Sequence, residues 1–158
     1  MSYRMLSLAT GVLLVAGWTS HSTTPRPARS TTFTARMNGA QETPANNTKG
    51  SGSVTFTLDG TKLKYSIEVK DLSGAATAAH VHVGAVGVAG PPVYTFAIKA
   101  GTTSGTVAEG TIELTTDASA GVPGDSLRKL LSNGNAYVNV HTKNFPGGEI
   151  RGQVIRKQ

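Results

Sequence analysis

The sequence predicts an all-β domain, an antiparallel β-sandwich or barrel of about eight strands with one short helix. Apolar residues alternate with polar ones along successive segments, as they do in strands with one buried face. Clusters of Gly, Pro and Asn separate these segments. The composition agrees, because 19 of the 158 residues are Gly and only 38% are apolar, a profile that favours short strands and turns over long packed helices.

Each expected strand follows from the same period of two. In the first, Phe33, Ala35 and Met37 alternate with polar neighbours. Asp59-Gly60 separates the second and third strands, and this pair tolerates positive φ, so a hairpin is expected there. The expected strands are 32–37, 53–58, 62–69, 78–83, 93–98, 106–114, 136–142 and 149–156.

One helix is expected around residues 125–131. Asp125 is a candidate N-cap, and Gly134 is a candidate C-terminal stop. Leu127, Leu130 and Leu131 have the i, i+3, i+4 spacing of one helical face. Such a short helix is not stable alone, so its leucines are expected to cover one end of the β-domain.

The N-terminus resembles a secretory signal. Arg4 precedes an apolar stretch over 5–18, which is shorter than the ~20 residues that span a bilayer. Trp18 stands where a lipoprotein would carry its modified cysteine, so no lipid anchor is expected. Residues 1–22 are interpreted as the signal-like segment, with an uncleaved anchor or disordered tail as the alternative. The Ser/Thr/Pro/Arg-rich residues 23–32 are then a tether to a domain over 33–158. These features predict a secreted or periplasmic protein without a transmembrane span in the mature chain.

Composition argues against several functions. The chain has no cysteine, which excludes disulfides, thiol nucleophiles and thiolate metal sites. Its formal net charge of +6 is spread along the chain without basic runs or interleaved aromatics, so nucleic acid is not an expected partner. The sparse acids and the absence of Gly-x-Ser-x-Gly argue against a hydrolase.

Three histidines beyond the tether form the most informative pattern. His80 and His82 are two residues apart on an expected strand, so both side chains leave one face. On another strand, His141 shares a face with Tyr137 and Asn139. Three imidazoles with open coordination positions suit copper or zinc. The alternative is that each histidine is an exposed or hydrogen-bonded strand residue without a metal.

Several separated motifs occur in order along the chain, in the segments 33–44, 50–52, 78–82, 134–142 and 146–153. Together they resemble the CHRD (chordin) domain family over residues 33–155. In animals this domain is repeated in chordin, an extracellular antagonist of bone morphogenetic proteins, and in bacteria it stands alone in secreted or envelope proteins. The resemblance implies location and fold more firmly than activity.

A weaker resemblance, to copper/zinc superoxide dismutase, implies a Greek-key β-sandwich. It also implies copper ligands at His80, His82 and His141, with Arg151 as an anion guide. The chain lacks a bridging histidine, a zinc loop and a disulfide, so a mononuclear copper site is the form of the analogy that fits. The alternative for Arg151 is a salt bridge or loop anchor. Glu42 is a candidate partner that orients an imidazole, or a loop anchor.

Three function hypotheses follow. The first is an extracytoplasmic copper-binding module for metal handling in the envelope. The second is a metal-free adhesion or protein-binding module of the chordin type, with an envelope or extracellular protein as partner. The third is a copper enzyme with dismutase-like activity, and the sequence favours a non-enzymatic function over it. The fold resemblance alone does not assign an activity.

Overall fold

The computed structural model describes residues 30–114 and 123–158. The signal-like segment, Trp18 and most of the tether lie outside these residues. The first strand begins at Thr31, inside the range expected to be tether. Within the described residues, no helix is long and apolar enough to cross a membrane.

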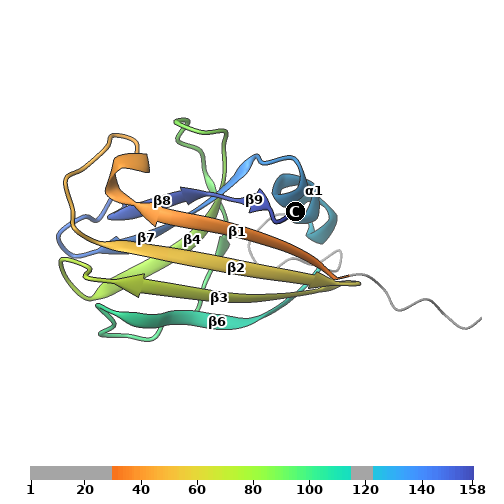
Figure 1. The fold of residues 1–158 in the computed structure, drawn as a ribbon, viewed down its shortest axis with the longest axis horizontal. Coiled ribbons are helices and arrows are strands. Elements are labelled where there is room, and N and C mark those ends of the chain that lie inside the picture. Colours follow the sequence, from red (N-terminus) through yellow and green to blue (C-terminus); the bar gives the residue numbers. More distant parts are fainter. Residues whose placement is uncertain (1–29, 115–122) are drawn as a thin grey trace, which may run out of the picture.

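The expected all-β fold with one short helix is confirmed (Figure 1). The strands form a continuous antiparallel sheet in the order β5-β4-β7-β8-β1-β2-β3-β6, and β9 pairs with β1. Their bounds are β1 Thr31–Asn38, β2 Ser51–Asp59, β3 Lys62–Lys70, β4 Ala76–Val83, β5 Pro92–Thr95, β6 Gly105–Glu113, β7 Ala136–Thr142, β8 Ile150–Gln153 and β9 Ile155–Arg156. A one-turn 3-10 helix, η1, covers Gly39–Gln41.

The sheet curls so that its two halves share a single core. Phe33 and Phe56 come from one half and Val81 and Val138 from the other, and each is at most 1% exposed in the same hydrophobic cluster. The β2–β3 hairpin turns at Asp59-Gly60 as expected, with Gly60 at φ 58. The period of two therefore assigned the buried faces correctly, because each of these strands packs one face on the core.

The helix α1, Gly124–Ser132, begins two residues earlier than an N-cap at Asp125 predicts. Pro123 is its N-cap residue, and Asp125 lies in the first turn instead of capping it. There the carboxylate still faces the positive end of the helix dipole. Leu127 and Leu131 are buried in the core cluster, and Gly134 follows the helix at φ 69, as the sequence predicted.

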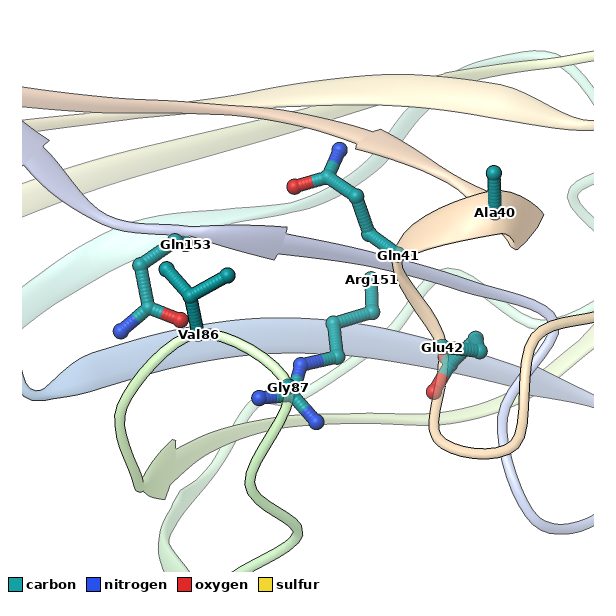
Figure 2. Close-up of a pocket in the computed structure, with 7 residues that line it drawn as sticks. All are labelled: Ala40, Gln41, Glu42, Val86, Gly87, Arg151 and Gln153. Carbon is teal, nitrogen blue, oxygen red and sulfur yellow. The ribbon is translucent and has the colours of Figure 1, made fainter.

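Three connections gather beside β8: Arg151 of β8 hydrogen-bonds to two of them, and Asn46 in the first hydrogen-bonds to carbonyls of the third. They are η1 with residues 42–50, the β4–β5 loop over 84–91, and the β7–β8 loop over 143–149. A pocket of about 190 Å³ lies between the first two, with Glu42, Val86 and Arg151 among its lining residues (Figure 2). The histidine-bearing strands β4 and β7 are direct neighbours, so the topology brings the candidate ligands to the same part of the outer face of the sheet, away from the core.

Candidate metal centre

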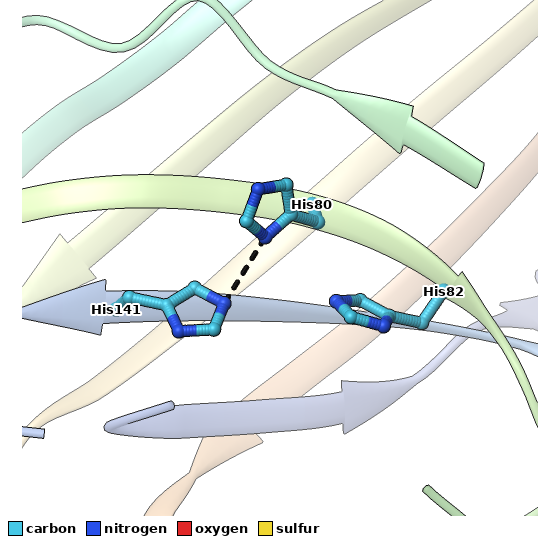
Figure 3. A group of neighbouring side chains, drawn as sticks. All are labelled: His80, His82 and His141. Carbon is cyan, nitrogen blue, oxygen red and sulfur yellow. Dashed lines mark hydrogen bonds between the residues drawn. The ribbon is translucent and has the colours of Figure 1, made fainter. Parts of the chain in front are cut away.

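The three histidines converge on the outer face of β4 and β7 (Figure 3). Strand register explains this placement, because β4 and β7 pair with Ala78 opposite His141 and His80 opposite Asn139. The intervening Ala79 and Val81 are fully buried on the core face. One nitrogen from each imidazole lies within 4.8 Å of the others. Within residues 30–114 and 123–158, no carboxylate belongs to this group.

Two backbone carbonyls orient two of the imidazoles. His82 Nδ1 lies 2.8 Å from the Gly90 carbonyl, and His141 Nδ1 lies 2.9 Å from the Pro146 carbonyl. A carbonyl oxygen only accepts, so each Nδ1 carries the proton and donates it. In the neutral rings, Nε2 of His82 and Nε2 of His141 are therefore unprotonated, as in metal-bound histidines whose second nitrogen is hydrogen-bonded. His141 Nε2 lies 3.0 Å from both His80 Nδ1 and Asn139 Oδ1, so a metal ion would displace these two contacts.

The third imidazole, that of His80, faces the other two with Nδ1 instead of Nε2. His80 Nδ1 lies 3.0 Å from His141 Nε2, and it donates to that lone pair in the metal-free protein. A metal ion would replace this shared proton, which would move to His80 Nε2. The donor set is then Nδ1 of His80 with Nε2 of His82 and His141.

The spacing of these nitrogens fits a single ion. Metal–nitrogen bonds of ~2.0–2.1 Å place two ligand nitrogens about 3.3–4.2 Å apart, depending on the angle. The observed nitrogens are 3.0 Å apart for His80 and His141 and within 4.8 Å for the whole group, so rotamer adjustments of less than an ångström suffice. His82 Nε2 is buried and has no hydrogen-bond partner among the described residues, which is costly unless another ligand satisfies it.

The surroundings of His80 and His82 favour the neutral form of both imidazoles. Burial lowers the pKa of His80, and the neighbouring His141 and His82 lower it further. Burial also lowers the pKa of His82, despite the opposing hydrogen bond to Gly90. Both imidazoles are therefore neutral at physiological pH, the state that binds metals.

A stack of side chains continues from His82 into the protein. The Tyr137 ring is parallel to the His82 ring, with 4.8 Å between centroids and 12° between planes. The Arg151 guanidinium lies over the Tyr137 ring, 3.4 Å from its centroid. Sequence reasoning placed Tyr137 on the face of His141 but missed this stack, because the stack depends on the cross-strand pairing of Tyr137 with His82, which the sequence alone does not show.

Arg151 anchors two loops. Its Nη2 donates to the Ala85 and Val88 carbonyls at 3.2 and 2.9 Å, and Nη1 donates to Thr43 Oγ1 at 3.2 Å. Only 2% of the residue is exposed, and it forms no ion pair within the described parts of the chain. The geometry is that of a loop anchor, without a free guanidinium that faces an open path.

Glu42 lies in the pocket of Figure 2, and none of the hydrogen bonds given above for the imidazoles involves it. Its Oε1 is buried and has no hydrogen-bond partner in the part of the chain that the structure describes. Burial raises the pKa of this carboxyl to about 7, although Arg151 and the Thr43 backbone oppose the change. The carbonyls of Gly90 and Pro146 orient His82 and His141 instead, and the sequence carries no side-chain signal for such contacts.

Glu42→Gln is expected to stabilise the protein above neutral pH. The folded-state pKa of Glu42 is about 7 against an ordinary value of 4.5, so the wild type loses stability as the pH rises from 4.5 through 7. The variant should be equal to wild type near pH 4.5 and more stable by about 1–2 kcal/mol above pH 7.5. Urea unfolding at both pH values measures the difference.

The exposed Glu113, paired with Lys62 at 3.9 Å, provides the matched control for this comparison. Glu113→Gln should change stability by less than about 0.5 kcal/mol at either pH, since exposed ion pairs contribute little. A Glu42→Gln difference that does not vary with pH would contradict the burial of an ionisable carboxyl.

Fold and site together define the class of protein: a small all-β domain that carries a three-imidazole cluster on the outer face of its sheet. The model of the CHRD domain family matches residues 33–154, so the chain belongs to the CHRD domain family. No significant match was found among curated proteins or among solved structures.

Proposed function

We propose that this CHRD-domain protein binds one copper ion through His80, His82 and His141. The observation that carries the proposal is the convergence of three imidazole nitrogens within 4.8 Å of one another. The hydrogen bonds of His82 and His141 to carbonyls support it, since they leave Nε2 of both rings unprotonated. An all-imidazole set suits copper, which binds nitrogen ligands more strongly than the other divalent first-row metals.

The proposed role is copper handling outside the cytoplasm. Residues 1–22 resemble a secretory signal. A secreted or periplasmic module meets copper before the cell takes it up and after the cell expels it. With three protein ligands, at least one coordination position stays open, so copper can exchange with another ligand.

A copper titration of the full chain tests this function. The wild type should bind one Cu(II), with nitrogen hyperfine structure in its paramagnetic resonance spectrum. His80→Ala and His141→Ala should each lower the affinity by at least about 100-fold, because each removes a direct ligand. Thr95→Ala is the matched control, since Thr95 is exposed and lies opposite His80 on β5.

Two results would contradict the copper site. One is a spectrum that the histidine variants leave unchanged. The other is zinc binding that copper cannot displace, which would assign the cluster to a different metal.

A metal-free protein-binding module is the second candidate. Val86 and Val88 are 79% and 53% exposed in the β4–β5 loop, and Arg151 fixes that loop through two carbonyls. Exposed apolar residues on a fixed loop are typical of protein contacts. If copper neither binds nor stabilises the fold, an envelope or extracellular protein that contacts this loop becomes the leading hypothesis.

Dismutase-like activity receives less support from the site. It needs a guanidinium that faces both the metal and the path of a small anion. Arg151 is committed to three hydrogen bonds and to the Tyr137 ring. We therefore favour binding over catalysis for this domain.

A further inference from the structure

A rigid stack connects a buried positive charge to the proposed copper site. Tyr137 is 3% exposed and lies between the His82 ring and the Arg151 guanidinium. The Gly90 carbonyl receives both His82 Nδ1–H at 2.8 Å and the Tyr137 hydroxyl at 3.2 Å. The three side chains and one carbonyl therefore fix the position of the cation relative to the ligand ring.

Tyr137 acts here as a spacer. Its hydroxyl donates to a carbonyl, which is not a base, and a guanidinium covers one ring face. Loss of an electron from the phenol either needs an acceptor for its proton or leaves a second positive charge against Arg151. Both features oppose oxidation of the ring, so the electrostatic effect of Arg151 at the metal is the consequence that matters.

Charge at the site distinguishes the two oxidation states of copper. Three imidazoles are neutral donors, and within the described residues no carboxylate joins them. The nearby fixed charge of Arg151 is positive. The Glu42 carboxyl also interacts with Arg151, but burial raises the pKa of Glu42 to about 7, so this carboxyl is mostly neutral below that pH and offsets little of the positive charge there. Cu(II) carries one more unit of charge than Cu(I), so this environment penalises Cu(II) more.

We infer that Arg151 is a positioning residue that, through the Tyr137–His82 stack, biases the three-histidine site toward Cu(I) over Cu(II). The inference rests on the proposed copper function and adds the oxidation state of the bound copper ion. It also explains why a buried arginine faces an aromatic ring next to a metal ligand, since hydrogen bonds to the loops alone would not require that placement.

Separate affinities for Cu(I) and Cu(II), measured on the full chain by competition with chelators specific for each state, test the inference. Arg151→Met removes the charge and keeps much of the side-chain volume. It should lower the ratio of Cu(I) to Cu(II) affinity by about tenfold, mainly by tightening Cu(II). Arg156→Met, which removes an exposed arginine on β9, is the matched control and should leave the ratio within about twofold.

Arg151→Lys distinguishes charge from loop anchoring. Lysine keeps a cation near the ring and loses the fork that binds the Ala85 and Val88 carbonyls. The ratio should stay within about threefold of wild type. If Met and Lys lower it equally, the effect comes from loop anchoring and the inference is overturned. If Arg151→Met does not fold, as judged by its thermal transition, Arg151→Gln replaces it with the same expected loss.

The outcomes separate the two proposals. Wild-type protein that binds neither oxidation state overturns the copper function and this inference with it. Wild-type protein that binds both states, with a ratio that neutral substitutions of Arg151 leave unchanged, overturns only the inference.

Discussion

Glu149→Ala is expected to lower the free energy of unfolding by about 3–5 kcal/mol. The Glu149 carboxylate is fully buried and accepts four hydrogen bonds. Thr48 Oγ1 and Thr142 Oγ1 each donate at 2.6 Å, and Ser73 donates from its amide and its hydroxyl at 2.7 and 2.8 Å. Alanine leaves these donors unpaired around a cavity. Urea unfolding measures the loss.

Glu149→Gln is the control that separates charge from volume. Glutamine keeps the shape but turns one acceptor into a donor, so a smaller loss of about 1–3 kcal/mol is expected at neutral pH. Burial by itself would raise the pKa of Glu149, but the hydrogen bonds from Thr142, Thr48 and Ser73 outweigh it and lower the pKa. The stability that ionised Glu149 contributes is therefore present above the ordinary value of 4.5 and is lost as the pH falls through the lower folded-state value.

The difference between wild type and Glu149→Gln should thus shrink on acidification below pH 4.5. A loss of less than about 1 kcal/mol in Glu149→Ala would show that water replaces the carboxylate without cost, contrary to the buried network. The substitution should also weaken copper binding, because Glu149 ends the loop whose Pro146 carbonyl orients His141.

The sequence predicted the parts of this molecule that depend on local periodicity. Strand faces follow from alternation, so the burial of Val81 and Val138 and the outward direction of His80 and His82 were predictable. The helix leucines were predictable for the same reason. The capping role assigned to Asp125 was wrong, because the N-cap is Pro123, two residues earlier in the chain.

Contacts between segments distant in sequence were not predictable from one chain. No local pattern places Ser73 or Thr48 beside Glu149, which lies 76 and 101 residues away. The sequence left Arg151 as an anion guide, a salt-bridge partner or a loop anchor. Which of these roles Arg151 has depends on where the loop over 84–91 folds back. The backbone carbonyls of that loop carry no residue-specific signal in the sequence.

The approach of His141 to His80 and His82 likewise required the sheet order. Strands β4 and β7 are far apart in the chain, and only their direct pairing brings the imidazoles together. The same-face spacing of His80 and His82 was a necessary condition that the sequence satisfied, whereas convergence is a property of the topology.

Copper at about 100 times its dissociation constant is expected to stabilise the folded protein by about 2.7 kcal/mol, or roughly 10 °C in Tm. The increment arises because only the folded chain assembles the three nitrogens. His82→Ala should abolish it, while the exposed-strand control Thr95→Ala should retain it. Thermal unfolding with and without copper at pH 7.5 measures both.

Acidification should remove this stabilisation. The folded-state pKa values of His80 and His82 lie below the ordinary value of 6.5, so neutral imidazoles contribute stability that is full above 6.5 and is lost as the pH falls toward the folded-state values. Protons also compete with copper for the same nitrogens. Both effects have the same sign, so the wild type should lose the copper increment and part of its metal-free stability between pH 6.5 and 5. A copper increment that persists at pH 5, or that survives in His82→Ala, would place the ion on ligands other than these imidazoles.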